Sequence, residues 1–122
     1  MYKPGSPSKP VRRHGRRYRA LNPLGEGDAE LMTIVNRGEF SLNGFRNRDL
    51  RSHLYPATKD KQKQRTEMAA VGRRLRLLRA HGLIAKVPTT HRYIVTEKGR
   101  NAITALLAAR NASTEKLTAL AA

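Results

Sequence analysis

The sequence predicts a mainly helical protein with one small β-hairpin, in the order helix, helix, helix, hairpin, helix. Three observations predict this class. Apolar residues recur at steps of three and four along residues 62–80, two short β-prone runs follow across turn residues, and a Thr-Glu helix start follows the second run. At 122 residues, the chain has room for one ordinary domain plus a tail.

Residues 1–24 are predicted to form a disordered, flexible basic arm rich in proline and arginine. The segment holds seven basic residues, four of the six prolines, no acidic residue and only seven apolar residues. So little apolar surface does not offset the entropy that ordering costs. We therefore expect an arm at 1–24, a domain at 25–112 and a C-terminal helical extension at 113–122.

The domain is expected to begin with a helix over about 28–37. Asp28 is placed as its N-terminal cap, apolar residues recur at helical spacing from Leu31, and Gly38 ends it. Residues 40–42 are then expected to form a short strand.

A second short helix is expected after the Asn43-Gly44 turn. Phe45, Leu50 and Leu54 mark one face of it, and it ends before Pro56 because the residue preceding a proline disfavours helix.

The helix over 62–80 is expected to be the longest and the most basic. Its predicted buried stripe consists of Gln64, Met68, Val71, Leu75 and Leu78. Leu77 falls on the outward face, where we expect it to cover the base of the hairpin or to meet a partner. The helix should end with Gly82 in the left-handed conformation and Leu83 folded back onto Leu78.

The hairpin is expected from two β-prone runs, 83–87 and 93–95, joined by turn residues. Thr96 is expected to cap a fourth helix whose buried face carries Ile103, Leu106 and Leu107. This helix either continues past Asn111 or gives way to a last short helix that Ser113 and Thr114 cap.

Two local patterns resemble the winged-helix DNA-binding domains of the MarR-like kind. The first, Leu75-x-x-Leu78-x-x-x-Gly82-Leu83-Ile84, is similar to the exit of a recognition helix into the wing. The second, Tyr93-x-Val95-Thr96-x-x-Gly99-Arg100, is similar to the junction between wing and last helix. The resemblance covers roughly residues 27–110. It implies a winged helix-turn-helix that places its third helix in the major groove of DNA, most often in transcriptional control or as a mobile-element accessory factor.

The charge of the chain indicates nucleic acid as its partner. Lys and Arg number 25 against 9 Asp and Glu, a formal net charge of +16. Seventeen of the 25 basic residues are arginine, which favours forked recognition of phosphate and guanine.

Nucleic-acid contacts are expected from four regions. The outward face of the long helix offers Gln62, Lys63, Arg65, Thr66, Ala69, Arg73 and Arg76. The hairpin tip offers Thr90 and Arg92, and the second helix offers Arg48 and Arg51. The arm offers Arg12, Arg13, Arg16, Arg17 and Arg19.

Three alternatives stay open at this point. In the first, the basic face of the helix is only a solvated surface. In the second, the chain is an RNA-binding accessory subunit of a ribonucleoprotein, and its arginine-rich arm folds on RNA. In the third alternative the C-terminal apolar residues pair with a protein partner or a second copy, although they equally suit the domain's own core. These residues are Ile103, Leu106, Leu107, Leu117 and Leu120.

Several classes of function are not expected. The absence of Cys excludes a disulfide framework, a Cys-ligated zinc site and a thiol nucleophile. The four histidines (His14, His53, His81 and His91) form no metal-binding or acid–base pattern, so we expect no enzyme, metal or cofactor. His81 is instead expected to be a cation near a helix C-terminus. No membrane segment or secretory signal is present, so a cytoplasmic place in a bacterial or archaeal nucleoid is expected.

Overall fold

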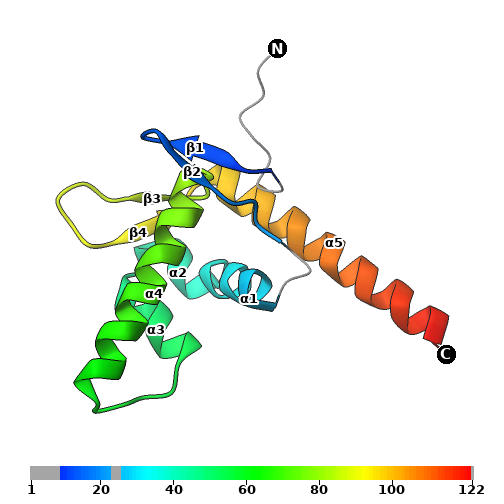
Figure 1. Cartoon of the computed structure of the whole chain (residues 1–122). Helices are drawn as coiled ribbons and strands as arrows, with labels where there is room; N and C mark the ends of the chain where they lie inside the picture. The colour runs from blue at the N-terminus through cyan, green and yellow to red at the C-terminus, as the bar shows by residue number, and fades with distance from the viewer. Residues whose placement is uncertain (1–8, 23–25, 122) are drawn as a thin grey trace.

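The computed structural model describes residues 9–22 and 26–121, and it describes side chains for 9–22 and 27–116. In these ranges the protein is mainly helical, as predicted, and it has two small antiparallel hairpins where one was predicted (Figure 1). The elements are β1 (Val11–Arg13), β2 (Arg16–Tyr18), α1 (Glu26–Val35), α2 (Gly38–Asn43), α3 (Asn47–Leu54), α4 (Lys61–Ala80), β3 (Ile84–Lys86), β4 (Tyr93–Val95) and α5 (Glu97–Ala121).

The ends of α4 are fixed by local hydrogen bonds. At its start the Asp60 carboxylate accepts from the backbone N–H groups of Gln62 and Lys63. At its end Gly82 has a φ of 75°, the Gly82 N–H donates to the Arg79 carbonyl, and the Leu83 N–H donates to the Leu78 carbonyl, each over 3.0 Å. This is a Schellman motif, so the predicted helix and its predicted end are confirmed.

Only the C-terminal half of α4 packs into the core. Val71, Leu75 and Leu78 are at most 2% exposed, but Met68 is 48% exposed and Gln64 is also exposed, so the predicted buried stripe is wrong for its first two residues. Figure 1 shows the reason: the N-terminal end of α4 projects past the other elements, with α3 beside it. The helical repeat of the predicted stripe extends further toward the N-terminus of α4 than the core does.

The β3–β4 hairpin is antiparallel, with Ile84 opposite Val95, and it confirms the predicted hairpin. Phe45 adds a single bridging residue to this sheet. The Phe45 N–H donates to the Tyr93 carbonyl over 2.8 Å, and the Tyr93 N–H donates back over 2.7 Å. The prediction that Phe45 belongs to a helix is therefore wrong, because its backbone pairs with a residue 48 positions away in the sequence.

A compact junction joins β4 to α5. The Thr96 hydroxyl accepts from the Gly99 N–H over 2.9 Å, as a helix cap does, and donates to the Gly82 carbonyl over 2.7 Å. Gly99 is buried against the Leu83 backbone, where a Cβ would lie 1.9 Å from the Leu83 oxygen. The predicted Thr96 cap is confirmed, and of the two alternatives for the C-terminus, α5 continues as one helix.

Two predictions for residues 26–43 are wrong. Residues 38–43 form helix α2 and not a strand, with Phe40 buried and Leu42 89% exposed. A short apolar run does not distinguish helix from strand by its pattern alone. Asp28 lies inside α1, which begins at Glu26, so it does not cap that helix.

The predicted disorder of the basic arm is wrong for the part that the structure describes. β1 and β2 form an antiparallel hairpin with Val11 opposite Tyr18, and its two-residue turn has positive φ at both His14 and Gly15. Leu21 is 2% exposed and belongs to the core. The apolar partners that the segment lacks within itself are supplied by the rest of the protein. Residues 1–8, 23 and 24 of the predicted arm lie outside the described residues.

One apolar core joins all the helices. Its fully buried members include Leu31, Met32, Phe45, Leu50, Val71, Leu78, Leu83, Ile84 and Ile103. Within the described ranges, no helix combines the length and the apolar character needed to cross a membrane.

Candidate nucleic-acid interface

The N-terminal hairpin lies against the C-terminal half of α4. β1 contacts α4, and residues 16–19 face the α4 segment that contains Leu77, which is only 7% exposed. The sequence placed Leu77 on the outward face of the helix, under the β3–β4 hairpin or a partner. The structure puts the chain's own β1–β2 hairpin beside it, which accounts for an apolar residue on that face.

Two hydrogen bonds tie the β1–β2 hairpin to the end of α4. The Arg13 guanidinium donates to the Arg79 carbonyl over 2.9 Å. The His81 ring contacts the Arg19 carbonyl through Nε2 over 2.7 Å, and because a carbonyl only accepts, Nε2 carries the hydrogen. His81 is 1% exposed, and its Nδ1 is buried without a hydrogen-bond partner among the described residues. The predicted place of His81 near a helix C-terminus is confirmed, and its predicted positive charge stays a prediction.

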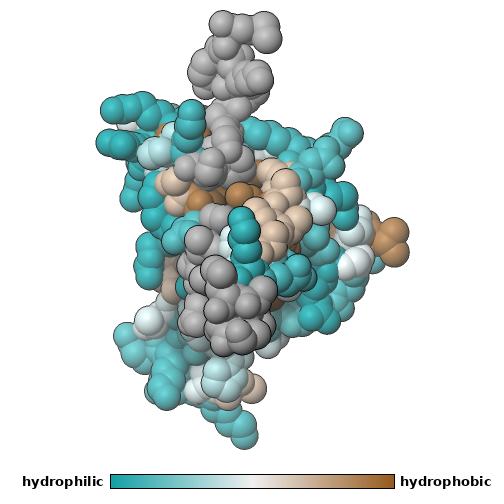
Figure 2. Space-filling model, turned by 90° about the vertical axis from the view of Figure 1, so that its right-hand side faces the viewer, coloured by the Kyte–Doolittle hydropathy of each residue, from teal (hydrophilic) through white to brown (hydrophobic). Residues whose placement is uncertain are grey.

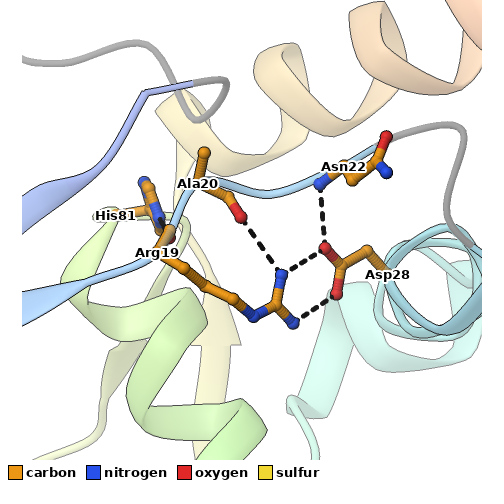
Figure 3. Close-up of polar contacts among 5 residues, drawn as sticks. All are labelled: Arg19, Ala20, Asn22, Asp28 and His81. Atoms are coloured by element: carbon orange, nitrogen blue, oxygen red, sulfur yellow. Dashed lines mark hydrogen bonds and ion pairs between the residues drawn. The ribbon is translucent and has the colours of Figure 1, made fainter.

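A third contact joins the segment after the hairpin to α1 (Figure 3). The Arg19 guanidinium donates to both carboxylate oxygens of Asp28, over 2.7 and 2.8 Å, and the Asn22 backbone N–H donates to the same carboxylate over 2.8 Å. The hydrogen bonds from Arg19 lower the pKa of Asp28 against the opposing effect of burial, and the positive charge of Arg74 lowers the pKa further. Arg19, a predicted nucleic-acid contact, therefore serves to order the chain.

Replacing Asp28 by Asn is expected to lower the free energy of unfolding by about 2 kcal/mol at neutral pH, because charge-assisted hydrogen bonds from Arg19 and Asn22 are lost. The pKa of Asp28 is lower in the folded state, so its ionisation stabilises the fold above the ordinary carboxyl pKa of about 3.9. That contribution is lost as the pH falls through the lowered pKa.

Urea denaturation between about pH 3 and 7 measures this effect. The difference between the protein and its Asp28→Asn variant should be largest above about pH 5 and should shrink toward pH 3. Glu115→Gln removes an exposed carboxylate of α5 and is the matched control, with little change expected at any pH. A difference that stays constant with pH would contradict the proposed role of the ionised carboxylate.

The hairpin and α4 enclose an elongated cleft lined mainly by arginine. Its larger part, about 440 Å³, is lined by Arg16, Arg17, Tyr18, Arg19, Ala70, Arg73, Arg74, Arg76 and Leu77. A smaller part, about 270 Å³, is lined by Arg13, His14, Arg16, Tyr18, Arg76 and Arg79. The two parts share three residues, and no carboxylate is among their lining residues. We call this feature the arginine cleft.

Beside the cleft, the outward face of α4 forms an exposed strip. Every residue predicted from this face is exposed, and at a helical period they lie on one side of the helix, away from the stripe that enters the core. These residues, the α4 strip, are Gln62, Lys63, Arg65, Thr66, Ala69, Arg73 and Arg76. Arg73 and Arg76 belong to both the strip and the arginine cleft.

The predicted contacts at the tip of the β3–β4 hairpin have partners within the protein. The Thr90 hydroxyl donates to the Val87 carbonyl and accepts from the Arg92 N–H, so it holds the turn. The Arg92 guanidinium donates to the Asn43 carbonyl at the end of α2. Both side chains are half-buried, and neither belongs to the α4 strip or the cleft.

The remaining predicted contacts divide by position. Arg12, Arg16 and Arg17 are exposed on the β1–β2 hairpin, whereas Arg13 is half-buried against α4. Arg48 is exposed on α3, apart from the residues of the cleft, and Arg51 is half-buried with its Nε buried and without a partner among the described residues.

Six residues that line the cleft are absent from the contacts predicted from the sequence: His14, Tyr18, Ala70, Arg74, Leu77 and Arg79. A signal was present for Tyr18. Val11 and Tyr18 flank a His-Gly turn at matched distances, a pattern that fits a two-residue hairpin. Arg74 and Arg79 lie between the buried stripe and the outward face of α4. The helical repeat predicts neither burial nor outward exposure for such positions.

The predicted interaction through the C-terminal apolar residues stays a prediction. Ile103 is fully buried and Leu106 and Leu107 pack against the core, while the side chains of Leu117 and Leu120 lie outside those described. Figure 2 shows the face toward which α5 ends: many of its coloured residues are hydrophilic, and hydrophobic ones are seen near its centre and at its right-hand edge. Among the described residues, His, Asp and Glu side chains form no group of three that would hold a metal.

Comparisons of the chain with protein-family models, curated proteins and solved structures find no match. The function is therefore inferred from the geometry and charge of the α4 strip and the arginine cleft.

Proposed function

We propose that the protein binds double-stranded DNA by placing α4 in the major groove, on a winged-helix scaffold. The observation that carries the proposal is the α4 strip: seven exposed polar, basic or small residues follow one side of a 20-residue helix, and none of them is acidic. Such a strip meets the chemical needs of a helix that contacts phosphates and base edges.

The dimensions of α4 support a groove-binding role. A helix of 20 residues is about 30 Å long and, with its side chains, about 10–12 Å wide, which suits a major groove about 12 Å wide. The N-terminal end of α4 projects past the other elements, with α3 beside it (Figure 1), and the residues of the α4 strip in this half are exposed. Ala69 on the strip lets the backbone come close to base edges.

The arrangement of the other elements also supports the scaffold. α3 packs against α4, the β3–β4 hairpin follows α4 directly, and Phe45 adds the bridging residue of a third strand. This order of elements is that of a winged helix-turn-helix, with β3–β4 as the wing. A regulator of transcription or an accessory factor of a mobile element is the corresponding biological role.

DNA is favoured over RNA for a geometric reason. The major groove of A-form RNA is deep and narrow and does not admit a helix, and the alternative of an arm that folds on RNA assumed a disordered segment. Residues 11–18 instead form a hairpin that is tied to α4 by contacts within the protein. Competition between a random duplex DNA pool and structured RNA at one fixed salt concentration tests the choice. DNA should compete more strongly, and stronger competition by RNA would overturn the proposal.

Replacing Arg65 by Ala should weaken binding to the preferred DNA sequence by about 1–3 kcal/mol, because Arg65 is exposed on the projecting half of α4, where it contacts base edges in the proposed complex. The preferred sequence is first obtained by selection from a random duplex library. Binding to a scrambled duplex should weaken much less. Arg110→Ala, on α5, is the matched control. Equal losses on both duplexes would assign Arg65 to a phosphate and not to a base.

A further inference from the structure

We propose that the arginine cleft holds one phosphodiester strand of the bound DNA, so that the two halves of α4 have different roles. The projecting N-terminal half contacts bases, and the C-terminal half, together with the β1–β2 hairpin, grips the backbone. This inference rests on the proposed function and adds to it a second, separate binding site formed by the N-terminal hairpin.

The charge of the cleft calls for a polyanion. Six of the nine residues that line its larger part are arginines. Only Arg19 forms an ion pair there, with Asp28, and Arg16, Arg17, Arg73 and Arg76 form none with any carboxylate of the described residues. Guanidinium groups held this close repel one another, and an anion with several charges between them removes that repulsion.

The shape and chemistry of the cleft favour phosphates in a row. An arginine fork matches two phosphate oxygens, so several forks along one cleft suit successive phosphates of a strand better than a single small anion. The larger and smaller parts share Arg16, Tyr18 and Arg76 in their linings, so they lie next to each other between the hairpin and α4. Tyr18 and Leu77 supply an apolar side, against which the sugar of a nucleotide packs.

Both walls of the cleft are held in place by contacts within the protein. Arg13 and His81 tie the β1–β2 hairpin to the end of α4, and Arg19 ties the following segment to α1. Binding therefore does not have to order the hairpin, which lowers the entropic cost of association. The Arg16 guanidinium lies 5.6 Å from the centre of the Tyr18 ring, a cation–π contact that further limits its motion.

The position of the cleft links it to the α4 strip. Arg73 and Arg76 belong to both, so a strand that passes between β2 and α4 continues along the C-terminal half of the strip. The bases of the same duplex then face the N-terminal half, which carries Gln62, Arg65 and Thr66. The two sites are neighbours on one helix and bind one molecule together.

The double variant Arg16→Ala/Arg17→Ala tests the inference. Both residues are exposed, and among the described residues neither side chain forms a hydrogen bond to α4 or α1, so the fold should persist, as thermal unfolding of each variant will verify. We expect the slope of log affinity against log salt concentration to decrease in magnitude by about two, since two phosphate contacts are lost. The fold-loss of affinity should be the same on the preferred and on a scrambled duplex.

The matched control is Arg110→Ala/Lys116→Ala on α5, which removes the same charge away from the cleft and should leave the slope nearly unchanged. A second variant, Arg16→Lys/Arg17→Lys, keeps the charge and should keep the slope while lowering affinity, because the forks are lost.

Three results would overturn the inference and leave the proposed function standing: an unchanged slope in Arg16→Ala/Arg17→Ala, an equal decrease in the α5 control, or a loss confined to the preferred duplex. Failure of the unaltered protein to bind any duplex would instead overturn the proposed function itself. The two failures are therefore distinguishable in one set of titrations.

Discussion

Raising the salt concentration from about 50 to 200 mM should weaken duplex binding by roughly 10³- to 10⁵-fold, the loss typical of a protein that contacts about 6–10 phosphates. The physical reason is that arginine side chains bound to phosphates replace the counterions of the DNA, which are released into solution. The chain carries a formal net charge of +16, and the α4 strip and the arginine cleft place enough arginine and lysine side chains on adjoining surfaces to make such a set of contacts. Fluorescence anisotropy with a labelled duplex, repeated over a series of KCl concentrations, measures the slope.

Single-stranded DNA of the same length is the internal control for this measurement. The slope per phosphate contact is about 0.9 for duplex DNA and about 0.7 for single strands, because single strands condense fewer counterions. A protein that grips one backbone strand should therefore bind single-stranded DNA with a shallower slope than duplex. If the slope measured with duplex DNA corresponds to fewer than about three phosphate contacts, the arginine-rich surfaces face solvent in the complex.

The elements that the sequence predicted well are those whose determinants are local. The stripe of Val71, Leu75 and Leu78 and the glycine at position 82 lie within or next to α4, and the Thr96 cap lies next to α5. Each of these features acts through residues a few positions apart, so a pattern of the sequence contains it. The exposed side of α4 followed from the same pattern, and all seven residues of the α4 strip are exposed.

The features that the sequence failed to predict depend on distant contacts. Phe45 pairs with Tyr93, and the β1–β2 hairpin draws its stability from Leu21 in the core and from hydrogen bonds to the ends of α4 and α1. Composition alone indicated disorder for residues 1–24, because composition counts the apolar residues of a segment and not those that the rest of the protein offers. The arginine cleft was missed for the same reason, since one of its walls is that hairpin.

Replacing Gly99 by Ala should destabilise the protein by about 3 kcal/mol or more, even though alanine is the better helix former by about 1 kcal/mol. Gly99 lies in the first turn of α5, and a Cβ there would be 1.9 Å from the oxygen, 2.7 Å from the carbonyl carbon and 2.9 Å from the Cα of Leu83. All three atoms are backbone, so no side chain can rotate away. The first turn of α5 has to move, and the Thr96 N–H then loses its bond to the Leu83 carbonyl.

Gly38→Ala provides the matched control for this substitution. Gly38 is the first residue of α2, it is exposed, and a Cβ there meets nothing within 4 Å. Thermal unfolding should therefore show a midpoint lowered by roughly 10 °C or more for Gly99→Ala and almost unchanged for Gly38→Ala. Because Gly99 is remote in sequence from the α4 strip, a folded Gly99→Ala protein should still bind DNA at low temperature. Equal unfolding midpoints for the two variants would show that α5 does not pack closely against the Leu83 backbone. This packing would then not explain the position of the β3–β4 hairpin beside α4.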